Sequence, residues 1–215
     1  MSINPLKIIQ FELGPMDNFA YIIICEETNN CMIVDPAWDP QKFIRTIEQN
    51  SLTLSGILLT HGHHDHTNGV NQILNYKNCP IYYSIGEIKF EPPKTANIAQ
   101  VKHNDKVKLG NQTIAVLATP GHSSDHISFY TNPNLISGDA LFIDGCGRCD
   151  LPSSNIEDMY HTLFNVILSL PEETLIHPGH NYSDKKTDTI KNQKKTNRFL
   201  RSKNKKEFIR KRNGF

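Results

Sequence analysis

The chain has 215 residues, of which 38% are hydrophobic and 21% are charged, and its formal net charge is only +1. This balance is typical of a soluble globular protein with a sizeable core, and a single domain over residues 1–215 is the simplest expectation. No run approaches the roughly 18 apolar residues of a membrane span, and the N-terminal residues lack the basic region and long apolar stretch of a signal peptide.

The first part of the chain alternates between polar and apolar residues in the way that β-strands do. Strands are expected at 7–13, 19–25 and 31–35. Asp39-Pro40 then opens a helix that runs to Gln49, because proline is tolerated in the first turn of a helix. The short apolar run Gly56–Thr60 predicts a buried strand that leads directly into His61.

The rest of the chain continues this mixture of elements. Helices are expected at 70–76 and 156–168, and strands at 80–83, 106–109, 113–118, 126–130, 134–137 and 174–177. Residues 90–100 contain two adjacent prolines and no periodicity, so a loop is expected there. Strands in two groups, interleaved with helices, predict an α/β sandwich of layered sheets and helices.

The last segment, about residues 185–215, is strongly basic. It contains 13 Lys and Arg residues against two acidic ones, Asp188 and Glu207, and its helical pattern is interrupted at Asn197. Such a block fits a solvated helical face, a binding surface for a small anion, or a contact to nucleic acid or an anionic membrane. The sequence leaves these three alternatives open.

The five cysteines are an odd and scattered set: Cys25, Cys31, Cys79, Cys146 and Cys149. A disulfide framework would use an even, patterned set, so a reducing cytoplasm is the expected location. Cys146 and Cys149 form a C-x-x-C pair, which is by itself a weak indication of redox or zinc chemistry.

The strongest chemical signal is the segment Thr60–His66, which reads THGHHDH. His61, His63, Asp65 and His66 directly follow a predicted strand, and imidazoles with a carboxylate are donors that suit zinc, iron and manganese. A single buried histidine is more often structural, but four potential ligands within six residues indicate a metal site. A tight loop at the strand end would point His61 and His63 at one ion.

Three more residues of ligand type follow predicted strands later in the chain. They are His122 in TPGH (119–122), Asp139 in SGD (137–139) and His180 in PGH (178–180). Each motif alone is weak, because Pro-Gly-His is usually a turn, but the shared context of strand, small residue and ligand type indicates one common site. His126 is expected to be structural or to support a ligand; His64, His103, His161 and His177 are unassigned.

These four motifs, in this order and spacing, closely resemble the metallo-β-lactamase superfamily. Within it, GDALFIDGCGRCD (138–150) and PGHNY (178–182) are similar to glyoxalase II enzymes and to persulfide dioxygenases. The resemblance extends from about Asn18 to about Arg201. It implies an α/β fold, an αβ/βα four-layer sandwich of two mixed β-sheets flanked by helices, with the site along one edge.

The resemblance also implies how the ligands are divided. His61, His63 and His122 would hold a first ion; Asp65, His66 and His180 would hold a second; and Asp139 would bridge the two. Two divalent metal ions are expected, zinc by preference, with iron or manganese as alternatives. Such a pair can lower the pKa of a shared water to about 7 and so supply a nucleophile at neutral pH, which Asp65 would orient as the catalytic carboxylate.

The glyoxalase II resemblance implies that the substrate is a small glutathione conjugate, S-2-hydroxyacylglutathione, cleaved to glutathione and a hydroxy acid such as lactate. Arg148 and Tyr182 match positions that contact the substrate in that group. Arg201, at the end of TNRFLR (196–201), is a candidate contact to a glutathione carboxylate, with Arg198 standing where the group has proline. The longer members have a C-terminal helical domain that supplies much of the glutathione contact, whereas only a short segment follows His180 here.

Two rival functions use the same residues. A persulfide dioxygenase would hold a single Fe(II) ion on His61, His122 and Asp139, the face of two histidines and one carboxylate that leaves positions for O₂. A metal-dependent nuclease would use the basic segment, but such members usually carry an inserted domain for which this chain has no space. The sequence therefore favours thioester hydrolysis, leaves the metal open, and predicts neither a nucleic-acid nor a membrane partner.

Overall fold

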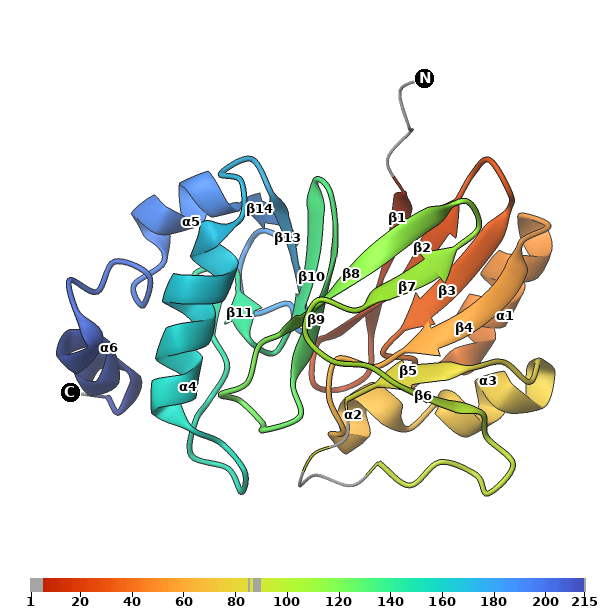
Figure 1. Ribbon diagram of the computed structural model, residues 1–215, viewed down its shortest axis with the longest axis horizontal. Helices are drawn as coiled ribbons and strands as arrows, with labels where there is room; N and C mark the ends of the chain where they lie inside the picture. Colours follow the sequence, from red (N-terminus) through yellow and green to blue (C-terminus); the bar gives the residue numbers. More distant parts are fainter. Residues whose placement is uncertain (1–5, 85, 87–89, 215) are drawn as a thin grey trace.

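The computed structural model describes residues 6–84, 86 and 90–214, and two six-stranded sheets form its centre (Figure 1). The first sheet has the order β1 (Lys7–Leu13), β2 (Asn18–Cys25), β3 (Asn30–Val34), β4 (Thr53–Leu58), β5 (Ile81–Tyr83) and β6 (Ile98–Gln100). Its first three strands are antiparallel, and β3 to β6 run parallel, so the sheet is mixed.

The second sheet is also mixed. Its order is β14 (Asp188–Thr189), β13 (Leu175–Pro178), β10 (Asn134–Gly138), β9 (Ile127–Thr131), β8 (Gln112–Ala118) and β7 (Lys106–Leu109). Only β10 and β13 pair in parallel, so these two strands end at the same edge. A separate two-stranded ribbon of β11 (Leu141–Phe142) and β12 (Gly145–Cys146) lies beyond the end of β10.

Strand β2 shows how the sequence builds the layers, because all eight of its residues are buried. Tyr21 and Ile23 pack with apolar residues of the second sheet, such as Phe129. Their neighbours Ile22 and Ile24 point to the opposite face and pack against helices. A strand covered on both faces reads as a continuous apolar run, as β2 does.

Helices cover the outer face of each sheet. On the first sheet lie α1 (Pro40–Gln49) and α3 (Val70–Tyr76); on the second lie α4 (Ile156–His161) and α5 (Ile190–Thr196), and α6 (Lys205–Arg212) packs against α4 (Figure 1). Helix α1 begins at the predicted proline and buries Phe43, Ile44 and Ile47 against the first sheet. The predicted four-layer αβ/βα sandwich of two mixed sheets is therefore confirmed.

Two local predictions were wrong. Residues 90–100 are not all loop, because Ile98–Gln100 form the edge strand β6, which pairs with β5 and is too short to show a period. The tight loop predicted at 61–66 ends in a short helix, α2 (His64–Thr67).

Two other local predictions are confirmed. The helical segment predicted at 156–168 is α4 followed by a π-helical turn (Thr162–Val166) and a 3-10 turn (Ile167–Ser169). The interruption predicted at Asn197 is the end of α5.

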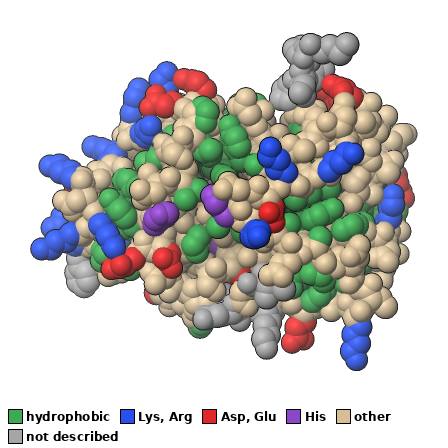
Figure 2. Space-filling model, in the orientation of Figure 1, with side chains coloured by type: hydrophobic (Ala, Val, Ile, Leu, Met, Phe, Trp, Pro, Cys, Tyr) green, Lys and Arg blue, Asp and Glu red, His purple; other side chains and the backbone are tan. Residues whose placement is uncertain are grey.

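Part of the charge of the basic segment is paired with acidic residues. Six of its lysines form ion pairs, four of them with acids earlier in the chain: Lys185–Asp188, Lys186–Glu12, Lys191–Glu173, Lys194–Glu172, Lys205–Glu157 and Lys211–Glu207. Figure 2 shows Lys and Arg side chains gathered over the end of the molecule that α5 and α6 form. Among the described helices, none has the length and apolar character needed to cross a membrane.

Candidate metal centre

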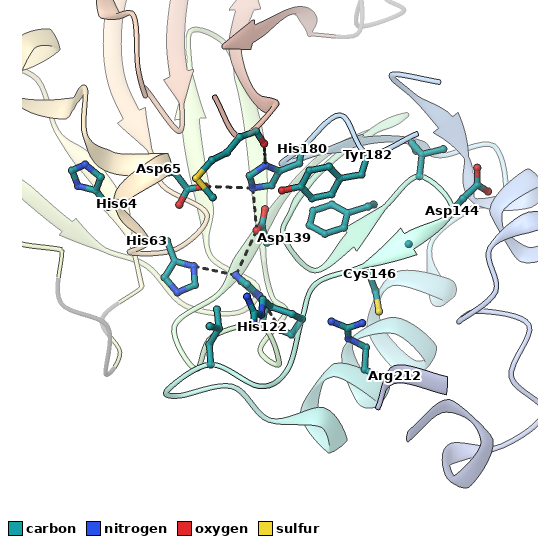
Figure 3. A pocket seen from close by; sticks show the side chains of 16 residues that line it. His63, His64, Asp65, His122, Asp139, Asp144, Cys146, His180, Tyr182 and Arg212 are labelled. Carbon is teal, nitrogen blue, oxygen red and sulfur yellow. Dashed lines mark hydrogen bonds and ion pairs between the residues drawn. The ribbon is translucent and has the colours of Figure 1, made fainter. Parts of the chain in front are cut away.

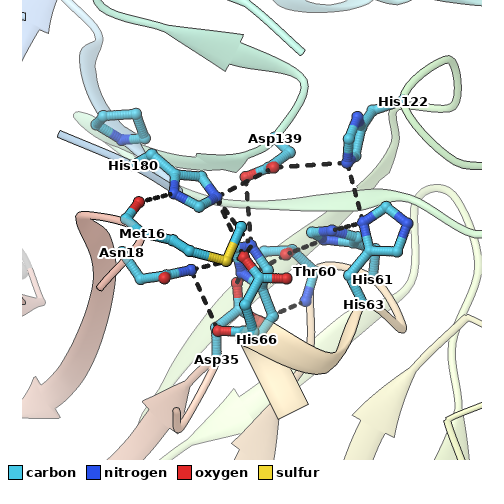
Figure 4. Close-up of polar contacts among 12 residues, drawn as sticks. Met16, Asn18, Asp35, Thr60, His61, His63, His66, His122, Asp139 and His180 are labelled. Carbon is cyan, nitrogen blue, oxygen red and sulfur yellow. Dashed lines mark hydrogen bonds and ion pairs between the residues drawn. The ribbon is translucent and has the colours of Figure 1, made fainter. Parts of the chain in front are cut away.

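All seven predicted ligands lie together at the edge where strands of both sheets end (Figure 3 and Figure 4). Strand β4 leads through Leu59 and Thr60 to His61, and α2 then carries Asp65 and His66. From the second sheet come His122 after β8, Asp139 after β10 and His180 after β13. The donor atoms fall into three overlapping groups: a first of His61, His63 and His122; a second of Asp65, His66 and His180; and a third, between them, of His61, His66 and Asp139.

The first group consists of histidine nitrogens at short range. His61 Nε2 lies 2.9 Å from His63 Nδ1, and His122 Nε2 lies 3.0 Å from the same atom. The ring centroids of His61 and His63 are 4.6 Å apart at 81°, so the two rings meet edge to face. Three nitrogens from three rings therefore surround one point, which is the arrangement that a tetrahedral or octahedral cation requires on one side.

The second group mixes nitrogen and oxygen. His66 Nε2 lies 3.3 Å from His180 Nε2, and Asp65 Oδ2 lies 3.4 Å from the former and 3.5 Å from the latter. Asp139 lies between the groups: its Oδ1 is 3.5 Å from His66 Nε2, and its Oδ2 is 3.5 Å from His122 Nε2 and 3.3 Å from His180 Nε2. This position suits the predicted bridge.

Hydrogen bonds on the outer side of the rings show which nitrogens are free to bind a cation. His122 Nδ1 lies 3.0 Å from the carbonyl oxygen of Arg148, and His180 Nδ1 lies 2.8 Å from that of Met16. A carbonyl oxygen only accepts, so each Nδ1 carries a proton, and Nε2 is the nitrogen of each ring left to offer a lone pair to a cation. Lone pairs that converge repel one another unless a cation lies between them. The donor set therefore fits two divalent metal ions.

Burial favours the neutral form of two histidines in the first group, His61 and His63. It lowers the pKa of His61 well below the ordinary value, with a further contribution from His66. Burial and the nearby His122 lower the pKa of His63 to about 4. Both rings are thus uncharged at neutral pH, as metal ligation requires.

The carboxylates make the second group different. Burial opposes protonation of His66, but Asp139 and Asp35 outweigh it and raise the pKa of His66 to about 9. In turn, burial would raise the pKa of Asp139, but His66 and His180 outweigh it and hold that pKa well below the usual range. Without metal, His66 therefore carries a proton that a cation must displace.

Three residues that support the ligands were not predicted. Asp35, at the end of β3, accepts from Thr60 N and Thr60 Oγ1 at 2.8 and 2.7 Å and lies 3.0 Å from His66 Nδ1, so it fixes the ring of His66. Asn18 contacts Asp65, and Trp38 contacts Asn18. Asp35 follows a strand end in the same way as Asp139 does, and that shared context could have identified it.

His126 lies outside the three donor groups. Its Nε2 accepts from the backbone N–H of Asp139 at 3.0 Å, and its Nδ1 lies 2.8 Å from Thr119 Oγ1. It supports the loop that carries Asp139. Gly179 explains part of the last motif, because a Cβ at this position would lie 2.1 Å from Asp139 Oδ1, so a side chain there would displace the proposed bridging carboxylate.

A cavity of about 700 Å³ opens onto the donor set (Figure 3). One part of it is lined by five of the predicted ligands, His63, Asp65, His122, Asp139 and His180. Met16, Phe142, Ile143 and Leu151 give it an apolar wall, and Tyr182, Cys146, Arg148 and Arg212 also line it. A hollow with an apolar wall and a few polar groups is typical of a small-molecule site.

The predicted substrate contacts lie in different surroundings. Tyr182 stacks on His180 with ring centroids 4.8 Å apart at 11°, and burial with Asp139 and Asp65 raises its pKa to about 12, so the phenol keeps its proton. Arg148 borders the cavity, but its Nε and Nη2 donate to Asp150 at 2.7 and 2.8 Å. Arg201 is exposed and is not among the described residues that line the cavity. Arg212 was not predicted, because no motif includes it.

Comparison with known proteins agrees with the fold and the site. The Metallo-beta-lactamase superfamily model matches residues 13–180. A "probable polyketide biosynthesis zinc-dependent hydrolase" of Bacillus velezensis is 30% identical to this chain, and the match covers 91% of this chain and 87% of that protein. A hydroxyacylglutathione hydrolase of Pectobacterium atrosepticum is 36% identical over 78% of this chain, which spans 63% of that enzyme's length. ETHE1 of Myxococcus xanthus has a TM-score of 0.88 at 30% identity, covering 97% of this chain and 90% of its own.

The chain belongs to the metallo-β-lactamase superfamily, as the ligand motifs predicted. Within that superfamily it is a metallo-hydrolase, an enzyme whose donor set suits two divalent ions and whose similarity extends to the glyoxalase II group. The seven ligand assignments, the bridging role of Asp139 and the three substrate contacts stay predictions.

Proposed function

We propose that this metallo-hydrolase cleaves a thioester, S-2-hydroxyacylglutathione, to glutathione and a hydroxy acid, with S-lactoylglutathione as the representative substrate. The observation that carries the proposal is the cavity. The converged donor set lines one part of it, and an apolar wall and positively charged arginine side chains line the rest. An acyl thioester has a carbonyl, an apolar carbon–sulfur link and, in glutathione, carboxylates on the thiol half. The similarity to a hydroxyacylglutathione hydrolase supports the same assignment.

His61, His63 and His122 would hold one zinc ion and Asp65, His66 and His180 the other, with Asp139 in contact with both. When bound, such ions lower the pKa of water to near neutrality and polarise a carbonyl group. Asp65 is half-buried, and its carboxylate faces the cavity, where it accepts the proton of the attacking water and orients it. A thiolate leaves without a proton, so the chain need not supply a strong general acid.

Tyr182 and the apolar wall position the acyl group. The Tyr182 ring lies against both His180 and Phe142, with centroids 4.8 and 5.3 Å away, so its hydroxyl is held beside the donor set. Because its pKa is raised, it donates a hydrogen bond at neutral pH and suits the 2-hydroxyl group of the acyl part. A glutathione thioester belongs to a reducing compartment, so the proposal implies a cytoplasmic location.

The test combines a metal analysis with two assays. The protein is purified without chelator, its metal content is measured by elemental analysis, and release of thiol from S-lactoylglutathione is followed. The proposal expects two divalent ions per chain and thiol release without O₂. A single iron ion, with O₂ uptake on glutathione persulfide and no thioester cleavage, would instead establish the persulfide dioxygenase.

A further inference from the structure

The last helix, α6, places one arginine in the cavity. Arg212 is one of the residues that line the cavity, and Figure 3 shows its guanidinium beside Cys146, pointing into the hollow. The helix is firmly attached, since Phe208 is fully buried and packs against Tyr160 and Phe164 of the α4 region. The Arg212 guanidinium also lies over the Phe199 ring, 5.5 Å from its centroid.

Arg212 forms no ion pair in the described part of the chain. Its Nε is buried without a hydrogen-bond partner there. Asp150 lies near enough for the Arg212 charge to help lower the pKa of its carboxyl, but that carboxylate already accepts two bonds from Arg148. The adjacent thiols do not supply an anion, because burial raises the pKa of Cys149 to about 11 and that of Cys146 further.

The other charged residues of the lining are already compensated. Arg148 is paired with Asp150, and the carboxylate of Asp144 is turned to α5, where Thr196 Oγ1 donates to it at 2.6 Å. The remaining ionisable groups of the described lining belong to the metal centre or to His64, except for the protonated Cys146 and Tyr182. Arg212 is therefore the one uncompensated cation that this lining offers away from the donor set.

We infer that Arg212 is an anion subsite that binds a carboxylate on the thiol half of the substrate and so determines which thioesters the enzyme accepts. The inference rests on the proposed function, since it places the thioester carbonyl at the donor set and the thiol half along the apolar wall. A planar guanidinium binds carboxylate or phosphate through paired hydrogen bonds. A single guanidinium matches the charge of one carboxylate, whereas a coenzyme A thioester brings several phosphate charges.

The test uses the metal-loaded enzyme with three variants and three thioesters. Arg212→Met keeps an unbranched stem over Phe199 and removes the charge, Arg212→Lys keeps the charge without the fork, and Arg210→Met removes an exposed charge from the same helix as the control. The substrates are the lactoyl thioesters of glutathione, of coenzyme A and of neutral N-acetylcysteamine. Calorimetric titration with glutathione gives a binding constant that needs no turnover.

For Arg212→Met, we expect KM for S-lactoylglutathione and Kd for glutathione to rise about tenfold, with kcat within about twofold of the parent enzyme. The neutral thioester should be unaffected, Arg212→Lys should recover part of the loss, and Arg210→Met should match the parent. An equal rise in KM for the neutral thioester, or no change in KM or Kd with the glutathione ligands, would overturn the inference. A greater rise in KM for the coenzyme A thioester would overturn the assignment of a carboxylate as the bound anion. If the parent enzyme cleaves none of the three, the proposed function fails, and the glutathione titration alone decides on Arg212.

Discussion

The side-chain amide of Asn18 donates to Oδ2 of Asp65 at 2.9 Å and to the backbone carbonyl of Asp65 at 3.1 Å. Asn18 is fully buried, and its own Oδ1 accepts from the indole Nε1 of Trp38 at 2.7 Å. Trp38 thus fixes which way the amide of Asn18 faces, and Asn18 fixes one oxygen of the Asp65 carboxylate. The chain controls the second donor group through this relay, although neither Asn18 nor Trp38 is a ligand.

Removing the amide should weaken one of the two sites. In Asn18→Ala the Asp65 carboxylate loses its support, so the second divalent ion should bind about 10–100-fold more weakly, while the first stays bound. Trp38→Phe removes only the indole N–H and should give a smaller effect in the same direction. Competition with a chromogenic chelator measures both affinities. Two ions bound as tightly as in the parent protein would show that Asn18 has no such role.

Replacing the proposed bridge should affect both ions. Asp139→Ala removes the carboxylate that contacts His66, His122 and His180, so metal content and thioester cleavage should fall together, the latter more than about 100-fold. Asp158→Ala, an exposed acid on α4, is the control. The measurement is elemental analysis with kcat/KM on the same preparation. Activity retained with both ions present would refute the bridge.

Arg148 should have a smaller effect than Arg212, because it is already bound to Asp150. Arg148→Ala should raise KM for S-lactoylglutathione more than it lowers kcat, but by a smaller factor than Arg212→Met. Asp150→Asn releases the guanidinium and should lower KM. Initial-rate kinetics over a range of substrate concentrations distinguishes these effects. If Arg148→Ala left KM unchanged, Arg148 would no longer count as a substrate contact.

His177 should make the fold sensitive to mild acid. It is buried on β13, and burial lowers its pKa from 6.5 to about 4, so the folded protein keeps it neutral where the unfolded chain protonates it. The stability that neutral His177 contributes is fully present above pH 6.5 and is lost as the pH falls toward 4. Between pH 7 and 5 this should cost about 2 kcal/mol of the free energy of unfolding.

The variant His177→Gln isolates this contribution. It keeps an amide that can replace the contact to Asn134 Oδ1, which His177 Nε2 makes at 2.9 Å, but it cannot ionise. Urea unfolding of both proteins at the two pH values, with metal saturating, gives the comparison. The parent protein should lose more stability than the variant on acidification; parallel losses would mean that His177 titrates normally.

The sequence predicted the layers because the buried strands carry long apolar runs. The runs at 19–25 and 56–60 are buried throughout, so their hydrophobicity alone identifies them. Strands of two or three residues, such as β6, β11, β12 and β14, are held by their neighbours and show no period of their own. The π-helical turn after α4 likewise has no periodicity of its own that would identify it in the sequence.

The ligand side chains could be predicted because each follows a strand that ends at the common edge. The residues that orient them could not, since Asn18 and Trp38 act through single hydrogen bonds made by tertiary packing. Arg212 was missed for another reason. It enters the cavity only because Phe208 docks α6 against the second sheet's helices, a contact between segments whose sequences contain no shared motif.

The division of the donors between two sheets has a consequence for the order in which the molecule assembles. His61, His63, Asp65 and His66 belong to one half, and His122, Asp139 and His180 belong to the other. Each predicted site needs donors from both halves, so a pair of ions would bind only after the halves have docked. Ions bound there would hold the two halves together, and the native state would then persist for as long as the halves stay docked.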